Sequence, residues 1–178
     1  MNKCYTVNEP GHPLDGQTLY TGRYCGACAI VLLRKDDGNI YLLANQRGKG
    51  CENFIMKWNM PCGFMEDDES GKQCASRETF EECGIEIPPE YFSLLSVETR
   101  PEKCFNGHVT IRYITFLTEK SLVNLDLDAN EIGSTGGEVD EVNDRKWIPL
   151  KEYGKYDWAF HHEEVIEELI DSLGLECS

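Results

Sequence analysis

The stretch GFMEDDESGKQCASRETFEECGI, residues 63–85, carries the strongest local signals in this chain. Ser70 is followed three residues later by Gln73, which is the spacing of a capping box at the start of a helix. Gly84 is the residue type that ends a helix in a left-handed conformation. Together these signals predict a helix over about residues 71–83.

Three glutamates share one face of this predicted helix. Glu78, Glu81 and Glu82 stand at positions i, i+3 and i+4, which places their Cβ atoms roughly 5–6 Å apart. At an effective dielectric near 20, two such charges repel by on the order of 3 kcal/mol, and a divalent cation would reverse that sign. Oxygen ligands suit Mg²⁺ or Mn²⁺, which also bind substrate phosphates. The alternative is a solvated acidic face, because exposed like-charge pairs cost only about 0.2–0.5 kcal/mol each.

The full spacing resembles the signature of the Nudix hydrolases: Gly, five residues, Glu, seven residues, Arg-Glu, an aliphatic residue, any residue, Glu-Glu, any residue, Gly and an aliphatic residue. The chain matches from Gly63 to Ile85, with Thr79 at the first aliphatic position as the one departure. Cys62 stands where the family's Pro-Gly-Gly lead-in has its first glycine. The resemblance implies an α+β fold, an α/β/α sandwich with a mixed, curved β-sheet between helices.

The resemblance also implies a metal site. Glu78, Glu81 and Glu82 would bind Mg²⁺ or Mn²⁺, with Glu82 as the main anchor. The backbone carbonyl of Cys62 would be a further ligand. Bound in this way, the metal would hold the diphosphate oxygens and lower the pKa of a bound water.

Two further acids and one arginine receive roles from the same resemblance. Arg77 resembles the family arginine that orients the glutamates through a charge-assisted fork, and Glu69 is its expected partner. An ordinary helix-surface ion pair is the alternative. The segment before residue 142 is similar to a late family loop in which an acid supplies another metal ligand or the catalytic base. Glu141 is preferred there over Glu138 because it lies closer to the predicted strand.

Cations and histidines elsewhere suggest substrate contacts. Arg47, Lys49 and Lys57 lie just before the metal-binding segment and could face phosphates, although ordinary solvated cations are the alternative. His161 and His162 belong to a pattern that resembles one in ADP-ribose-type members. A surface or interface role at the start of a helix is the alternative for both histidines.

Hydrophobic patterning outlines the remaining elements. We expect residues 1–22 to form an extended arm or irregular lead-in, residues 100–108 a loop that borders the pocket, and residues 119–141 a long loop. An amphipathic helix is predicted over residues 158–173. The predicted strands cover residues 24–34, 40–46, 57–60, 91–99, 109–118 and 142–148.

Length and charge limit the possible functions. A chain of 178 residues fits one domain, here residues 23–178. Its net charge of −15 argues against binding a DNA or RNA duplex or an anionic membrane, so a small-molecule nucleotide diphosphate is the expected partner. Nine cysteines without an apolar signal peptide or a bilayer-spanning stretch favour a reduced, cytoplasmic protein. A homodimer is one assembly that the family resemblance allows.

Cys25 and Cys28 form a C-x-x-C pair, which is found in zinc ribbons and thiol redox enzymes. No second closely spaced pair exists, which argues against a zinc ribbon. The pair opens the apolar run CGACAIVLL, which is typical of a buried strand in which free cysteine packs as a small hydrophobe. Core packing is therefore expected, with thiol redox activity as the alternative.

The sequence as a whole favours a Mg²⁺-dependent pyrophosphohydrolase. By resemblance, it would cleave the pyrophosphate bond of a nucleoside diphosphate linked to another moiety. ADP-ribose or a nucleotide sugar is favoured, and a nucleoside triphosphate comes next. The alternative from another class is a sensor or regulatory module of the same fold that binds a nucleotide without turnover.

Overall fold

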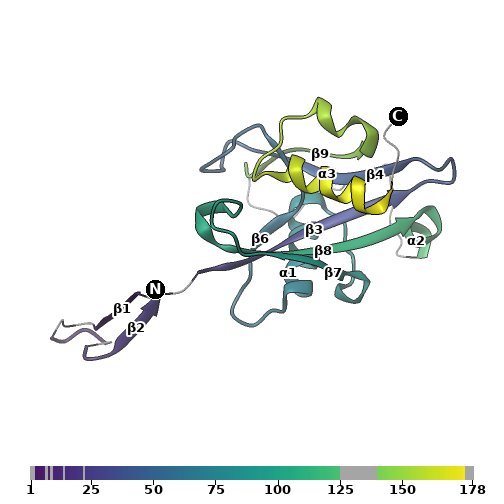
Figure 1. Cartoon of the computed structure of the whole chain (residues 1–178). Coiled ribbons are helices and arrows are strands. Elements are labelled where there is room, and N and C mark those ends of the chain that lie inside the picture. The colour runs from purple at the N-terminus through teal and green to yellow at the C-terminus, as the bar shows by residue number, and fades with distance from the viewer. Residues whose placement is uncertain are drawn as a thin grey trace.

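The structure is a computed structural model that describes residues 3–6, 8, 10–13, 15–21, 23–124 and 140–174. Two sheets and three α-helices are present in these residues (Figure 1). The strands are β1 (Lys3–Thr6), β2 (Thr18–Thr21), β3 (Cys25–Arg34), β4 (Ile40–Arg47), β5 (Trp58–Asn59), β6 (Cys62–Phe64), β7 (Ser93–Glu98), β8 (Val109–Thr118) and β9 (Val142–Pro149). The α-helices are α1 (Gly71–Cys83), α2 (Glu119–Asn124) and α3 (His162–Leu173), and short 3₁₀ helices cover Pro89–Tyr91, Phe105–Gly107 and Leu150–Lys155.

Strand β3 forms the centre of the molecule and is buried on both faces. Side chains alternate along a strand, so its residues divide between two cores. Cys28, Ile30 and Leu32 pack with the apolar face of α3, and the alternate residues from Ala27 to Leu33 pack with α1. The result is a sandwich in which the two helices cover opposite faces of one sheet (Figure 1), as the sequence predicts.

The main sheet is mixed and seven-stranded, with the order β5-β4-β3-β8-β7 and with β6 and β9 branching from it. Strands β3 and β8 run parallel along their whole length, while the other pairs are antiparallel. On its other edge β3 changes partner, because residues 32–34 pair with β4 whereas residues 26–28 pair with β6. The two partner strands separate at this point, and the space between them is where a site can form.

The first helix begins and ends as its local sequence predicts. Ser70 caps α1 through a capping box with Gln73, and Gly84 closes it with φ of 72°. The closing helix α3 starts later than predicted, at His162 rather than at residue 158. Phe160 and His161 have φ of 56° and 59°, which is incompatible with a right-handed helix, so the apolar periodicity extends beyond the helix itself.

Residues 1–22, expected to be an arm or irregular lead-in, contain in their described part the antiparallel pair β1–β2, which lies away from the sandwich in Figure 1. Two other segments differ from their predicted structure. The predicted loop 119–141 begins with helix α2, and residues 125–139 lie outside the described part of the chain. The short strand β6 was not predicted. In the described residues, no helix has the length and apolar character needed to cross a membrane.

Candidate active site

The site forms along the free edge of β6. Ala29 N–H donates to Pro61 O at 2.8 Å, so residues 29 and 61 form a hydrogen-bonded pair of the β3–β6 ladder. Hydrogen-bonded and non-hydrogen-bonded pairs alternate in an antiparallel ladder, which makes Cys28 and Cys62 a non-hydrogen-bonded pair. The backbone N–H and C=O groups of Cys62 therefore point away from β3, toward α1.

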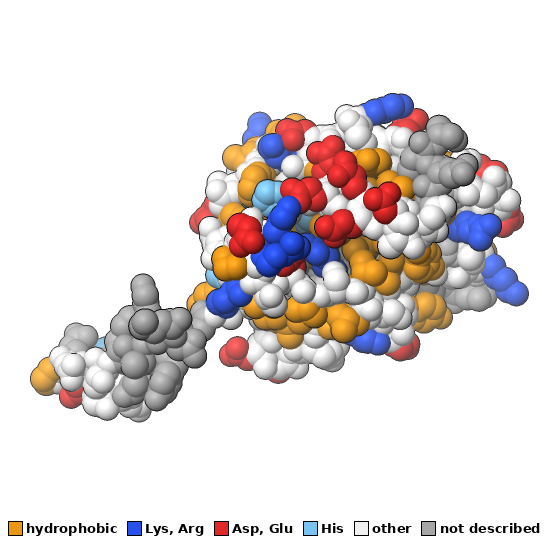
Figure 2. All heavy atoms as spheres, viewed as in Figure 1, with side chains coloured by type: hydrophobic (Ala, Val, Ile, Leu, Met, Phe, Trp, Pro, Cys, Tyr) orange, Lys and Arg blue, Asp and Glu red, His pale blue; other side chains and the backbone are white. Residues whose placement is uncertain are grey.

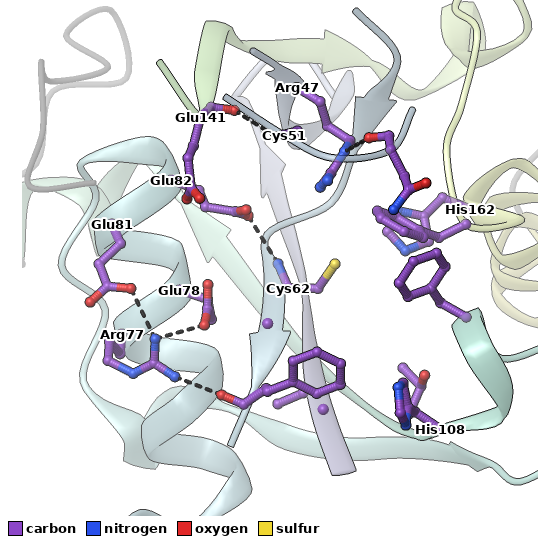
Figure 3. A pocket seen from close by; sticks show the side chains of 18 of the residues that line it. Arg47, Cys51, Cys62, Arg77, Glu78, Glu81, Glu82, His108, Glu141 and His162 are labelled. Atoms are coloured by element: carbon purple, nitrogen blue, oxygen red, sulfur yellow. Dashed lines mark hydrogen bonds and ion pairs between the residues drawn. The ribbon is translucent and has the colours of Figure 1, made fainter. Parts of the chain in front are cut away.

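Helix α1 contacts this edge through two of the predicted site residues. The Cys62 N–H donates to Glu82 Oε2 at 3.0 Å, as the dashed line in Figure 3 shows. Arg77 Nη2 donates to the Phe64 carbonyl at 3.0 Å. The glutamate face of the helix and the backbone of β6 are thereby brought to one wall of a cavity.

Arg77 lies at the centre of the acidic cluster. It meets Glu69 in a two-pronged contact, with Nη2 to Oε1 at 2.7 Å and Nε to Oε2 at 3.1 Å. Its Nη1 donates to Glu78 Oε1 at 2.6 Å and to Glu81 Oε2 at 2.9 Å (Figure 3). One guanidinium thus orients three carboxylates, and Glu69 occupies the partner position that the sequence predicts.

Burial shifts the protonation equilibria of these acids. It raises the pKa of Glu78 to about 7, an effect that Arg77 partly opposes. Burial also raises the pKa of Glu82 well above its ordinary value, and the nearby Cys62 and Glu78 add to this. In contrast, the hydrogen bonds from Arg77 lower the pKa of Glu69. Glu78 and Glu82 are therefore acids whose negative charge is poorly compensated by the protein alone.

The residues present fit a hard divalent cation. The predicted donor set consists of oxygens only, from Glu78, Glu81, Glu82 and the Cys62 carbonyl, and this suits Mg²⁺ or Mn²⁺. Gly63 leaves the room that the cluster needs, since a Cβ at this position would lie 2.0 Å from Glu78 Oε1. A cation would also offset the repulsion between the carboxylates of Glu78, which is buried, and Glu82, which is half-buried.

A cavity of about 780 Å³ opens beside the acidic cluster. Its lining includes the cations Arg47, Lys103 and Arg112 and the aromatic side chains of Phe105 and Phe160, in addition to the acids of α1. Figure 2 shows a similar mixture on the molecular surface, where Lys and Arg side chains gather among Asp and Glu side chains. The cavity thus combines phosphate-binding and apolar groups beside a candidate metal site.

Only one of the three cations proposed from the sequence lines this cavity. Arg47 does, with its guanidinium 4.8 Å from the centre of the Phe160 ring. Lys57 instead pairs with Asp157 at 2.9 Å, and Lys49 is exposed; within the described chain neither belongs to the cavity lining. The loop over residues 100–108 borders the cavity as expected. Lys103 belongs to this loop but was not singled out there, and Arg112 was not predicted because the pairing of β8 with β3, which is not local, brings it to the cavity.

The loop after β4 holds Glu141 at the cavity. Gly48 N–H donates to the Glu141 carbonyl at 2.6 Å, and Gly50 N–H donates to the Asp140 carbonyl at 2.8 Å. A Cβ on Gly48 would lie 2.1 Å from Asp140 O, so this approach requires glycine. Glu141 is part of the cavity lining, whereas Glu138 lies outside the described residues.

Aromatic rings form two groups around the cavity. Phe54, Phe105 and Phe160 contact one another edge to face, with centroids 4.8–6.2 Å apart. The second group, with centroids 4.9–5.7 Å apart, consists of Tyr24, Phe64 and His108. Rings of this kind can stack against a nucleobase. Neither group could be predicted from the sequence, because their members come from separate loops and strands.

The structure rules out Cys25 and Cys28 as a redox pair. They lie three positions apart in an extended strand, roughly 10 Å along its axis and on opposite faces, which is too far for a disulfide. Cys28 is buried, as predicted, and Cys25 is half-buried. Of the two histidines, His161 is exposed and contacts Glu164 at 3.1 Å, while His162 is buried and lines the cavity.

Comparison with known proteins agrees with this architecture. A family model described as the NUDIX domain matches residues 24–169. The chain belongs to the Nudix family. No curated protein matches this Nudix chain.

Solved structures share the fold at low sequence identity. The NUDIX domain of Shewanella oneidensis NrtR, complexed with ADP ribose, is similar at a TM-score of 0.67 and 22% identity, covering 86% of this Nudix chain and 90% of that one. A MutT/nudix family protein from Enterococcus faecalis matches at 0.64 and 23%, covering 86% and 64%. A Francisella tularensis bifunctional NMN adenylyltransferase/ADP ribose pyrophosphatase, complexed with AMP and a Mn ion, matches at 0.56 and 22%, covering 88% and 42%.

Proposed function

We propose that this Nudix protein is a Mg²⁺- or Mn²⁺-dependent pyrophosphohydrolase. Its substrate would be a nucleoside diphosphate linked to another moiety, with ADP-ribose or a nucleotide sugar favoured and a nucleoside triphosphate next. The observation that carries the proposal is the convergence of Glu78, Glu81 and Glu82 with Arg77 at the free edge of β6. Together they form an oxygen-rich wall in a cavity that is large enough for a nucleotide.

We call Glu78, Glu81, Glu82 and the Cys62 carbonyl the acidic wall. These four groups would hold the metal. When bound, Mg²⁺ would supply charge neutralisation for the diphosphate and a water of lowered pKa. Arg77 would keep the carboxylates in place, since its guanidinium already contacts Glu78 and Glu81. Its contribution is geometric, because carboxylates that are already held in place lose less conformational entropy when the metal binds.

Other residues of the cavity lining would hold the substrate and accept a proton. Arg47 and Arg112 line it and offer planar donors that suit phosphate oxygens. Glu141, whose backbone is held by hydrogen bonds from the loop that contains Gly48 and Gly50, is the candidate base that would accept the proton of the attacking water. The ring of Phe105 provides a surface on which a base could stack.

A substrate panel tests this proposal directly. ADP-ribose, a nucleotide sugar, a dinucleoside polyphosphate and a nucleoside triphosphate would each be incubated with the protein in Mg²⁺ and in Mn²⁺, and the products resolved by chromatography. We expect metal-dependent cleavage between two phosphorus atoms, fastest for ADP-ribose or the nucleotide sugar. Saturable binding of a nucleotide without turnover under any of these conditions would instead indicate a regulatory module and refute the enzyme.

A further inference from the structure

A buried cluster lies behind the acidic wall, on the α3 side of the sheet. The Sγ atoms of Cys28 and Cys62 and a ring nitrogen of His162 all lie within 4.8 Å of one another. Cys28 is 1% exposed and His162 5%, whereas Cys62 is half-buried and lines the cavity. The proposed hydrolysis uses only the backbone of Cys62 and leaves all three side chains without a role.

Strand register places the two sulfurs opposite each other. Cys28 and Cys62 are direct partners in the antiparallel β3–β6 ladder. Their pair is the non-hydrogen-bonded type, in which Cα atoms are about 4.5 Å apart and side chains are closest. Disulfides span Cα distances of about 4.4–6.8 Å, so side-chain rotation and small backbone shifts could close a bridge here.

A transition metal is the other chemistry that two thiols and an imidazole suggest. The hydrogen bonding of His162 disfavours it. Its Nδ1 accepts a hydrogen bond from the Met60 N–H at 3.0 Å, so the proton of the neutral ring resides on Nε2. That nitrogen is the one that faces Cys28 Sγ, at 3.9 Å. To ligate a metal, Nε2 would have to lose its proton to Nδ1, where it would meet the Met60 N–H donor.

We propose that Cys28 and Cys62 are a reversible oxidation site that forms a disulfide between β3 and β6 and weakens the candidate metal site. The link to metal binding is Cys62 itself. Its side chain belongs to the cysteine cluster while its N–H binds Glu82 Oε2 at 3.0 Å on the opposite side (Figure 3). A bridge would bring the two sulfurs to about 2.05 Å and shift the Cys62 backbone relative to β3, because disulfides favour Cα separations of about 5.5–6 Å over the roughly 4.5 Å of this type of pair. The effect on catalysis rests on the proposed function, whereas disulfide formation does not.

A peroxide can serve as the oxidant. One sulfur attacks the peroxide O–O bond as its thiolate and becomes a sulfenic acid, with release of one water. The second sulfur then attacks the sulfenic sulfur and expels a second water, which forms the S–S bond. Two thiols lose two electrons and two protons, and hydrogen peroxide is reduced to two waters. A dithiol reductant reverses the reaction.

The test should be made at equilibrium. The hydrogen bond with Cys28 and burial raise the pKa of the Cys62 thiol, so its reaction with peroxide is expected to be slow. The protein would be equilibrated in buffers of reduced and oxidised glutathione, alkylated, digested and examined by mass spectrometry. We expect a linked peptide that joins Cys28 to Cys62, and at least a fivefold loss of Mn²⁺ affinity that the reductant restores.

Two variants sharpen the result. Cys28→Ala removes the partner sulfur without touching the acidic wall, and should keep its Mn²⁺ affinity in the oxidised buffer. Cys25→Ala is the matched control, because it removes a half-buried cysteine from the same strand and should behave like the unchanged protein. Linkage through another cysteine, or the same loss of affinity in Cys28→Ala, would overturn the proposal.

The remaining outcomes are also decisive. A folded protein with both thiols still free in fully oxidising buffer would refute the disulfide. Protection of both thiols from alkylation by one equivalent of Zn²⁺ would show that the cluster is a metal site instead. If no substrate is ever hydrolysed, the linked peptide and the Mn²⁺ titration still report on the disulfide, so the two proposals can fail separately.

Discussion

Replacing Glu82 with glutamine should make the metal-free protein more stable while removing its response to metal. Glu78 and Glu82 stand one helical turn apart, with Cβ atoms about 5–6 Å from each other. At an effective dielectric near 20, and at a pH at which both carboxylates are ionised, two charges at this distance repel by about 3 kcal/mol. Glutamine keeps an oxygen that can accept the Cys62 N–H, although a bond to a neutral acceptor is weaker by about 1 kcal/mol. The net gain for Glu82→Gln is therefore about 2 kcal/mol.

Thermal unfolding with and without Mn²⁺ measures this effect. For a chain of this size, about 2 kcal/mol corresponds to a rise in Tm of about 4–8 °C. A metal at one hundred times its Kd stabilises the unchanged protein by about 2.7 kcal/mol, and this increment should be absent in the variant. Glu86→Gln is the control, because it removes an exposed acid just beyond α1 and should change neither value.

Two results would contradict the reasoning. A metal-free Glu82→Gln protein that melts below the unchanged protein would mean that Glu82 stabilises the fold by its charge, contrary to its raised pKa. An equal Mn²⁺-induced rise in Tm for both proteins would show that the metal binds elsewhere.

Three further predictions concern the pH dependence of stability, the loop that contains Gly48 and Gly50, and the ring of Phe105. The pKa of Glu78 is raised to about 7 in the folded state from 4.5, so the metal-free fold loses about 3 kcal/mol of stability through this group as pH rises across that window. Urea titrations at pH 5 and pH 8 should therefore show that the stability of Glu78→Gln, relative to the unchanged protein, is greater at pH 8 than at pH 5. Gly48→Ala places a Cβ against Asp140 O and should lower kcat/KM about tenfold, while the far-UV circular dichroism spectrum stays unchanged. Gly154→Ala is the control: its added Cβ meets no neighbouring atom, so kcat/KM should not change. Phe105→Ala should raise KM for a nucleotide about tenfold with little change in kcat, and Phe116→Ala on the exposed face of β8 should not; equal KM values would argue against stacking.

Local sequence determines α1 almost completely. Its start depends on Ser70 and Gln73, its end depends on Gly84, and all three act within a few residues of chain. The pairing of Arg77 with Glu69 follows once the helix is fixed, because the two residues then face each other across its first turns. These are the parts of the site that could be predicted without knowledge of the rest of the fold.

Contacts between distant segments explain what the sequence did not reveal. Strand β6 contains only three residues and follows Pro61, so its pattern resembles a turn, and its pairing with β3 depends on tertiary structure. The opposition of Cys28 and Cys62 could not be predicted for the same reason, because it depends on the register of β3 with β6. His162 is buried only because α3 packs over β3, and the late start of that helix depends on left-handed residues that have no distinct sequence signal.

The hydrogen bonds from Gly48 and Gly50 to the carbonyls of Glu141 and Asp140 fix the chain just before β9. Since the entry point is fixed from outside, insertions or deletions between residues 124 and 140 could accumulate over evolution without moving Glu141. Such a change in length would leave the part of the cavity lining at Glu141 in place. A fold arranged in this way can vary one connection while the lining of its cavity stays the same.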